Sequence, residues 1–213
     1  MKLVIGNKNY SSWSLRPWLL LHSNRMDFTE VHESLRQDNR RNRLGKYSGS
    51  CKVPVLIDRE LTIWDSLAIC EYISETYLEG KGWPLDPSLR ATARSICAEM
   101  HAGFNLLRSE LPMNCRHSSE LVLSTSAIAD VRRIESIWSE YAQKSSNGGL
   151  YLFGGFNIAD CFYAPVALRF RSYGIKLSGT AAEYQESILA HPSVCAWVAQ
   201  AGSESEVVPE IEV

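Results

Sequence analysis

A stretch dense in glycine and proline, residues 79–87, constrains the fold more than any other feature of the chain. It reads Glu-Gly-Lys-Gly-Trp-Pro-Leu-Asp-Pro. Glycine and proline at this density break helices and strands, so the stretch predicts a linker. Short strand-like and helical runs alternate before it, whereas only helical spacing follows it. Because 213 residues are enough for two small domains, we expect domains at residues 1–79 and 88–213, joined by a linker at 80–87.

The first domain is expected to contain a small sheet with helices packed on it. Apolar runs, rough alternation and helical spacing distinguish its elements. In chain order these are a strand at Leu3–Ile5, a helix at Leu15–Asn24, a strand at Phe28–Leu35, an irregular polar stretch at Arg36–Ser50, a hairpin of Val53–Ile57 and Leu61–Trp64, and a helix from near Ser66. The order β-α-β and then β-β-α suits a four-stranded sheet.

The second domain is expected to be wholly helical. The spacing of its apolar residues predicts helices at Ser88–Leu111 and 126–143, one from near Ile158, and shorter ones at 181–190 and 193–200. The acidic tail Glu204–Val213 contains a proline, so we expect it to lie as an extended strap or to fray.

Composition and charge exclude several classes of function. The chain is 45% apolar and 22% charged, with a formal net charge of −2. This balance gives no electrostatic case for binding nucleic acid or an anionic membrane surface. No apolar stretch approaches the roughly 20 residues that span a bilayer. The apolar run at the N-terminus is too short for a signal peptide. We therefore expect a cytoplasmic protein with no nucleic-acid or membrane partner.

The six cysteines are scattered along the chain, at positions 51, 70, 97, 115, 161 and 195. They form no C-x-x-C pattern and have no histidine at a spacing typical of zinc. We therefore expect neither a disulfide framework nor a metal site. Cys51 has no partner cysteine at a spacing that would support redox chemistry.

Three serines lie directly ahead of an apolar helix, in the stretch Asn9–Trp18 (NYSSWSLRPW). Pro17 is tolerated in the first turn of a helix, so the helix should begin at about residues 13–16. The serines then lie at its N-terminus, where unpaired N–H groups and the helix dipole favour an anion. The alternative is that one serine only caps the helix, and this alternative stays open for Ser14.

Two further motifs lie at turns of the first domain. In Lys52-Val53-Pro54 the proline begins an apolar strand. It is either an ordinary first residue of a strand or part of a cis X–Pro turn that leaves the Val53 backbone groups facing outward. Asp65 and Ser66 precede an apolar helix, where a cap accounts for one of them. The pair also suits an amino-acid head group, with the carboxylate meeting its ammonium and the hydroxyl its carboxylate.

A fourth motif begins a helix of the second domain. Asn157 as N-cap, with Asp160 three residues later, forms a pair similar to a capping box. We interpret this pair as structural. It indicates a helix start that is buried enough to need side-chain caps.

Together and in this order, the four motifs resemble the cytosolic glutathione transferase family over nearly the whole chain. The resemblance implies an α/β plus all-α fold, with a thioredoxin-like glutathione-binding domain followed by an all-helical domain that contributes the electrophile site. It also implies glutathione as co-substrate, and a cytoplasmic homodimer acting in detoxification. Val53 would pair through its backbone with the cysteinyl part of glutathione. Asp65 and Ser66 would hold the γ-glutamyl end, and Lys52 would assist binding.

The serine turn lies where this family places the residue that activates the thiol. The pattern S-S-x-S-x-R is most similar to that of the zeta class, whose motif reads Ser-Ser-Cys-Ser-Trp-Arg. Matched on Arg16, the catalytic serine is Ser11, with Ser12 as its alternative. Trp13 stands where the zeta motif has cysteine, and Leu15 where it has tryptophan, so the match does not extend to the whole motif.

A serine hydroxyl and a helix N-terminus would both favour the thiolate form of glutathione. The thiol pKa of free cysteine is ~8.5, so only a few per cent of it is ionised at neutral pH. A hydrogen bond donated to the sulfur lowers that pKa, and the helix dipole acts in the same direction. Serine rather than cysteine at this position favours conjugation over thiol-disulfide reduction.

The electrophile would be held by the second domain. Arg94, His101, Asn105 and Arg108 share one stripe of the helix expected at residues 88–111. They form either a solvated face or subunit interface, or a wall of the cleft between the domains that binds a polar or anionic substrate. His101, Asn105 and Arg108 are the predicted substrate-binding residues.

Three functions are compatible with these motifs. The first is a glutathione transferase in which the thiolate attacks an electrophilic carbon. The second is a glutathione-dependent cis-trans isomerase similar to the zeta class. The third is a non-catalytic glutathione-transferase-like module. The retained set of Lys52, Val53, Asp65 and Ser66 argues against the third, because a scaffold needs no glutathione pocket.

Overall fold

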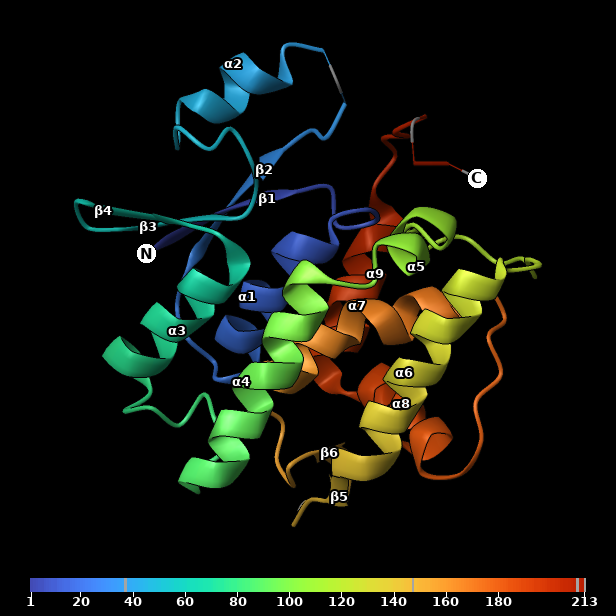
Figure 1. The fold of residues 1–213 in the computed structure, drawn as a ribbon. Coiled ribbons are helices and arrows are strands. Elements are labelled where there is room, and N and C mark those ends of the chain that lie inside the picture. The colour runs from blue at the N-terminus through green and yellow to red at the C-terminus, as the bar shows by residue number, and fades with distance from the viewer. Residues whose placement is uncertain (37, 147, 210, 213) are drawn as a thin grey trace.

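The chain folds into a small sheet unit that lies beside a larger helical unit (Figure 1). The computed structural model describes residues 1–36, 38–146, 148–209 and 211–212. The sheet unit is drawn in blue to teal, and the helical unit in green to red. Among the described residues, no helix is both long enough and apolar enough to cross a membrane.

The sheet has four strands in the order β2-β1-β3-β4. They are β1 Lys2–Gly6, β2 Thr29–Glu33, β3 Val55–Asp58 and β4 Leu61–Trp64. β1 pairs in parallel with β2 and antiparallel with β3, and β3 pairs antiparallel with β4. Two helices, α1 (Ser12–Ser23) and α3 (Ser66–Tyr77), pack against this sheet and against each other. This is the four-stranded arrangement predicted from the sequence.

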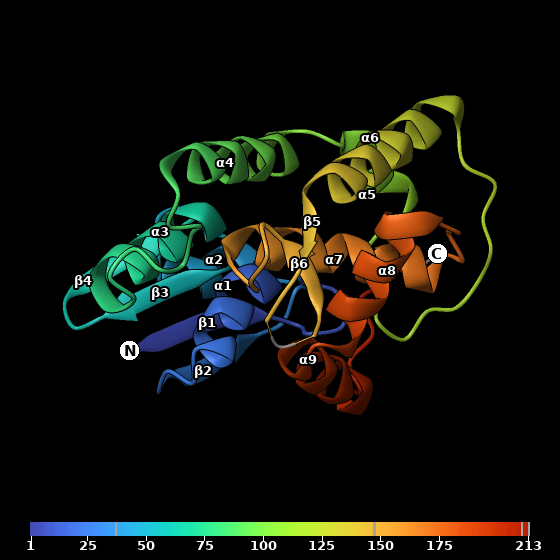
Figure 2. The same cartoon turned by 90° about the horizontal axis from the view of Figure 1, so that it is seen from below.

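The helical unit is built around α7, which is buried along nearly its whole length. Its helices are α4 Pro87–Ala102, α5 Asn105–Glu110, α6 Thr125–Tyr141, α7 Ile158–Ser172, α8 Gly179–Ala190 and α9 Pro192–Ser203. α7 contacts α1 of the sheet unit as well as α4 and α8, and Figure 2 shows it near the centre of the molecule. The two units therefore share one apolar core.

Residues 79–86 of the linker stretch carry no helix or strand, since α3 ends at Tyr77, and the last residue of the stretch, Pro87, begins α4. The stretch is nevertheless packed. The carbonyl of Gly82 accepts a hydrogen bond from the Ile158 amide at 2.9 Å. A Cβ on Gly82 would lie 2.8 Å from the Ser74 Cβ. The division into domains at residues 79 and 88 stays a prediction.

The capping box at the start of α7 is confirmed. The Asn157 side chain accepts a hydrogen bond from the Ala159 amide at 2.8 Å, and Asp160 accepts one from the Asn157 amide at 2.9 Å. Asp160 is buried and also accepts from the Leu152 amide and the Tyr184 hydroxyl. The motif therefore ties the start of α7 to its neighbours, as a structural role requires.

Three predictions about elements were wrong. The stretch Arg36–Ser50 is not wholly irregular, because it contains the short helix α2 (Arg40–Gly45). The second half is not wholly helical, because β5 (Ala142–Lys144) and β6 (Leu150–Leu152) form an antiparallel hairpin. α2 buries only one leucine, and the two strands have three residues each, so neither repeats long enough to give a periodic signal.

The third wrong prediction is the single helix at Ser88–Leu111, which is broken between α4 and α5. Phe104 has a φ of 57°, in the left-handed region where a helix cannot continue. Phe104, Leu107 and Leu111 are nevertheless buried with the apolar face of α4. The helical spacing of buried residues therefore runs across the break and hides it.

Candidate functional site

A cavity of about 870 Å³ lies between the two units. Its lining includes most of the residues predicted for the site. The sheet unit contributes to the lining Tyr10, Ser11, Ser12, Trp13, Leu35, Arg40, Leu44, Ser50, Cys51, Lys52, Val53, Pro54, Trp64, Asp65 and Ser66. The helical unit contributes His101, Arg108, Pro112, Met113 and Arg169, and the C-terminal tail contributes Ile211. The sheet unit therefore contributes the serines, the Val53 turn and two cations, Arg40 and Lys52, and the helical unit contributes Arg108 and Arg169.

The serine turn enters α1, which begins at Ser12, one residue before the predicted range. Ser11 is the N-cap residue of α1. The sequence had left this capping role open for Ser14. The Ser11 oxygen accepts from the Ser14 amide at 3.3 Å, and its hydroxyl donates to the Ser14 oxygen at 2.7 Å. Ser14 is fully buried and accepts from the Gly6 amide at 3.1 Å. The Ser11 proton is thus engaged within the turn.

Ser12 has a different environment. Its hydroxyl oxygen accepts a hydrogen bond from the Arg169 guanidinium at 3.2 Å, across the boundary between the units. Among the described contacts no acceptor takes the Ser12 proton, which leaves that proton available to a group in the cavity. A guanidinium donating to the oxygen polarises the O–H bond and strengthens it as a donor.

Val53 and Lys52 lie together at the turn before β3. The Val53–Pro54 peptide bond is cis, which is one of the two forms that the sequence left open. The ladder between β1 and β3 begins at Val55, so the backbone groups of Val53 lie outside it and at the cavity. Lys52 is exposed at the rim.

Asp65 and Ser66 form the mouth of α3, as predicted. One Asp65 oxygen accepts from the amides of Leu67 and Ala68 at 2.8 and 3.3 Å and caps the helix. Asp65 has a φ of 79°, a strained conformation for a residue other than glycine, with a cost of ~1–3 kcal/mol. Strain of this kind concentrates at functional sites, and here it accompanies a half-exposed carboxylate at the cavity.

The second Asp65 oxygen binds a side chain of the helical unit. It lies 3.0 Å from His101 Nε2. Burial lowers the pKa of His101, although the Asp65 carboxylate acts in the opposite direction. The His101 ring packs edge-on against Trp13, with 5.1 Å between ring centroids, and its Nδ1 is buried without a partner among the described residues. His101 therefore connects the C-terminal end of α4 with the N-terminus of α3.

Three arginines at this site, Arg16, Arg108 and Arg169, have no carboxylate partner among the described residues. Only Arg108 was predicted as a site residue, whereas Arg16 served to align the serine motif. Arg108 donates to the carbonyls of Met100 and Gly103 at the end of α4. Arg169 donates to the Leu111 carbonyl as well as to Ser12. Both line the cavity, so their charges face it.

Arg16 is the third arginine, and it lies beneath the cavity floor. It donates to the Ser66 hydroxyl at 3.2 Å and stacks between the rings of Trp13 and Phe162 at 4.2 and 4.3 Å. Its Nε is buried and has no partner among the described residues. Burial, with Arg108 and Arg169 nearby, lowers the pKa of Arg16 to about 9. The group is therefore still cationic at neutral pH.

Two residues of the predicted electrophile stripe lie away from the cavity. Asn105 is exposed at the start of α5 and does not line the cavity. The break between α4 and α5 rotates it off the stripe that was drawn on one continuous helix. Arg94 forms an ion pair with Glu71 at 3.0 Å. The structure thus brings together His101 and Arg108 with all six residues predicted for the thiol and for glutathione, and it leaves Asn105 outside.

Residues 10–76 match the family model of the glutathione S-transferase N-terminal domain. Solved structures of glutathione transferases are similar in fold over nearly the whole chain. A glutathione transferase homologue from Burkholderia with bound glutathione superposes with a TM-score of 0.72 at 23% identity, covering 95% of this chain and 98% of that one. A sphingomonad glutathione S-transferase complexed with glutathione gives a TM-score of 0.67 at 22% identity, covering 96% and 100%. The predicted fold class is confirmed.

Two relatives are similar in sequence. A probable maleylacetoacetate isomerase of Caenorhabditis elegans is 25% identical over 191 residues, which is 85% of this chain and 88% of the relative. A stringent starvation protein A homologue of Haemophilus ducreyi is 24% identical over 128 residues, 60% of this chain. That match spans 56% of the Haemophilus protein, little more than half of its length.

Proposed function

We propose that the chain is a glutathione transferase, because residues 10–76 match the glutathione S-transferase N-terminal domain and the fold is that of solved glutathione transferases. It takes glutathione as co-substrate and stabilises the thiol as thiolate. The thiol proton passes to solvent and the sulfur forms a bond to an electrophilic carbon. Either a leaving group departs from that carbon with its bonding electrons, or the sulfur adds to a double bond and the neighbouring carbon takes up a proton from solvent.

The observation that carries this proposal is the hydroxyl of Ser12, which faces the cavity with a free proton and with Arg169 bound to its oxygen. A thiolate needs a donor, and Ser12 supplies one next to the N-terminus of α1. Lowering a thiol pKa by ~1–2 units takes about 1.4–2.7 kcal/mol, which a charge-assisted hydrogen bond and the dipole can supply. Ser11 supports the turn as its cap. We therefore assign the thiolate contact to Ser12, the alternative of the two predicted serines.

Glutathione binding is assigned to residues of the sheet unit, the same unit that carries Ser12. The backbone of Val53 pairs with the cysteinyl part, and Lys52 at the rim meets a carboxylate of the tripeptide. Ser66 accepts from Arg16, so its proton is free to donate to the γ-glutamyl carboxylate. Asp65 offers its carboxylate to the γ-glutamyl ammonium.

The second substrate is an electrophile that carries negative charge. Arg108 and Arg169 line the cavity, Arg16 lies beneath it, and none of the three bonds to a carboxylate among the described residues. Cations without counter-ions in a partly desolvated cavity favour an anion strongly. His101 and Arg108 are the contacts we assign to this substrate.

Substitution of each serine tests the assignment. Ser12→Ala removes the thiolate donor, so we expect kcat at neutral pH to fall at least about tenfold. The affinity for glutathione, measured by calorimetry, should change little. Ser11→Ala should instead cost ~1 kcal/mol of stability through the lost cap, with a smaller loss of turnover. A wild-type protein that binds no glutathione would exclude the proposal, and full activity in Ser12→Ala would return the thiolate role to Ser11.

A glutathione-dependent isomerase is the second candidate, favoured by the similarity to the probable isomerase of Caenorhabditis elegans and by the cationic cavity. In that reaction the thiolate adds to an anionic alkene and leaves again after rotation. Product analysis by NMR separates the two, because conjugation consumes glutathione whereas isomerisation regenerates it. Binding of glutathione without either product would favour a non-catalytic module.

We also propose a cytoplasmic homodimer with a role in detoxification. Large apolar side chains are exposed on β4, α3 and α4, namely Leu61, Trp64, Tyr77 and Leu89. Burial of these side chains between two copies would cover this face. The mass in solution, measured by light scattering, tests the dimer.

A further inference from the structure

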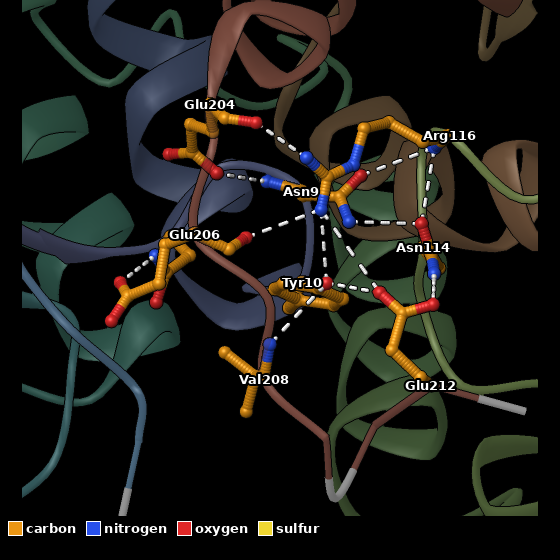
Figure 3. A network of polar contacts seen from close by, with 9 residues as sticks. Asn9, Tyr10, Asn114, Arg116, Glu204, Glu206, Val208 and Glu212 are labelled. Carbon is orange, nitrogen blue, oxygen red and sulfur yellow. Dashed lines mark hydrogen bonds and ion pairs between the residues drawn. The ribbon is translucent and has the colours of Figure 1, made fainter.

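The end of the chain forms a strap that lies across the segment leading into the serine turn (Figure 3). We define the strap as the described residues 204–209, 211 and 212, which follow α9. The Glu204 carboxylate accepts hydrogen bonds from the backbone amides of Lys8 and Asn9 at 2.7 and 3.0 Å. Glu206 accepts from the Asn7 side chain at 2.6 Å. The beginning of the strap is therefore fixed to residues 7–9.

The far part of the strap is fixed around Tyr10. The Glu212 carboxylate accepts from the Tyr10 hydroxyl, and from the Asn114 side chain at 3.2 Å. Arg116 donates to the Tyr10 oxygen at 3.0 Å and also to the Glu206 carbonyl of the strap at 3.2 Å. These contacts join three separate segments of the chain, as Figure 3 shows.

Ile211 is the strap residue that lines the cavity. It precedes Glu212, which binds Tyr10 and Asn114, and both of these adjoin the cavity lining. Tyr10 lines the cavity itself, and Pro112 and Met113, which also line it, directly precede Asn114. Tyr10, Pro112, Met113 and Ile211 all line the cavity, and we call this apolar part of the lining the apolar wall.

This apolar wall adjoins the cationic part of the cavity. Pro112 follows Leu111, whose carbonyl accepts from Arg169. Tyr10 precedes the serine turn. A group attached to the glutathione sulfur at Ser12 would therefore have the arginines on one side and the apolar wall on another. Rigid walls of this kind set the size of the ligand that a pocket accepts.

We propose that Ile211, held in place by Glu212, is a specificity-determining residue that limits the length of the group bonded to the glutathione sulfur. The proposal rests on the proposed function, since it needs glutathione at the serine turn. Ile211 closes the cavity on the side of the strap, and the contacts of Glu212 prevent the strap from yielding. The electrophile that fits is compact as well as anionic.

A series of S-alkylglutathiones tests this wall without knowledge of the natural electrophile. Calorimetry with S-methyl-, S-butyl- and S-octylglutathione gives the ratio of dissociation constants between the longest and the shortest chain. In Ile211→Ala we expect that ratio to fall about tenfold relative to wild type, because room for additional methylenes opens. Glu212→Gln keeps the size of the side chain and removes the charged acceptor, so it should lower the ratio in the same direction by less.

Val207→Ala is the matched control, since Val207 is an exposed strap residue that does not line this cavity. It should leave the ratio unchanged, and thermal unfolding should show all three variants folded. An unchanged or increased ratio in Ile211→Ala overturns the role of Ile211 while leaving the transferase intact. Failure of wild type to bind any member of the series overturns both proposals.

Discussion

At the scale of single residues, the cavity is dominated by buried positive charge. Arg16 and Arg169 are both buried, and burial lowers the pKa of each to about 9. Their hydrogen bonds go to carbonyls and hydroxyls, which leave the positive charge uncompensated. A buried cation without a carboxylate partner is costly for folding. An anionic ligand bound in the cavity would offset that cost by pairing with these charges.

A partly buried histidine, His191, gives a pH-dependent prediction. His191 is the N-cap of α9, where its Nδ1 accepts from the Ser193 amide at 3.2 Å and its ring stacks on Phe156 at 3.9 Å. Burial, with a contribution from His22, lowers the pKa of His191 to about 4. The folded pKa lies below the unfolded value of ~6.5, so the unfolded chain binds more protons between these values.

The stability from neutral His191 is therefore present above about pH 6.5 and is lost as the pH falls toward about 4. We expect His191→Asn, which can still cap but cannot titrate, to flatten the loss of unfolding free energy across this range by about 1–3 kcal/mol. Urea denaturation of both proteins at several pH values measures it. Parallel pH dependences for variant and wild type would contradict it.

The sequence predicted those site residues that local chemistry marks. Ser11, Ser12, Asp65 and Ser66 each stand at a helix start, where residue type and position are linked by capping, and the structure places all four at the cavity. Arg169 could not be predicted in the same way. It lies 157 positions after Ser12, within an apolar helix, and only the packing of α7 on α1 brings the two together.

At the scale of elements, the break between α4 and α5 positions the helical wall of the site. His101 belongs to the last turn of α4, and Arg108 belongs to α5. Because the chain turns at Phe104, Arg108 folds back and donates to two carbonyls at the end of α4. One arginine thus caps a helix and faces the cavity. The periodicity of buried residues could not reveal this, since it continues through the break.

Gly103 is the residue at which this turn can be tested. A Cβ there would lie 2.9 Å from the Glu99 carbonyl oxygen, which is backbone and cannot move aside easily. We expect Gly103→Ala to lower the free energy of unfolding by about 1–3 kcal/mol. Gly202→Ala is the matched control, because Gly202 lies in α9 with nothing within 4 Å of a Cβ. That change should stabilise by up to ~1 kcal/mol. Equal effects of the two substitutions in urea denaturation would contradict the role of Gly103.

At the scale of the whole molecule, the sheet unit and the helical unit are joined by more than the linker. α1 packs on α7 and α9, the Gly82 carbonyl binds the start of α7, and the strap returns to residues 7–10. The sequence predicted two domains because the spacing of apolar residues changes at the linker. That change carries no information on how tightly the two parts pack against each other. The site needs both units, since Ser12 and Asp65 each bind a residue of the helical unit.

Lys8 is the clearest buried connection between the units. Its ammonium lies 2.6 Å from Glu30 on β2 and also over the rings of Trp18 and Trp197, at 4.9 and 5.2 Å from their centroids. The Lys8 carbonyl accepts from the Trp197 indole at 2.9 Å. One residue therefore links β2, α1 and α9, and its removal leaves the Glu30 carboxylate with only the Trp18 indole and His32 as partners among the described residues.

We therefore expect Lys8→Ala to lower the free energy of unfolding by about 2–3 kcal/mol, less than the usual cost of breaking a fully buried ion pair, because the Glu30 side chain is 23% exposed. Because Lys8 contacts both units, tryptophan fluorescence and far-ultraviolet circular dichroism should report a single coincident transition in wild type and in the variant. Lys81→Ala removes an exposed lysine that pairs with Glu79 at the surface, so it should change stability little. Two separate transitions in wild type would show that the units unfold independently. In that case the buried contacts of Lys8 would not couple them, and the site between the units would be lost when the less stable unit unfolds.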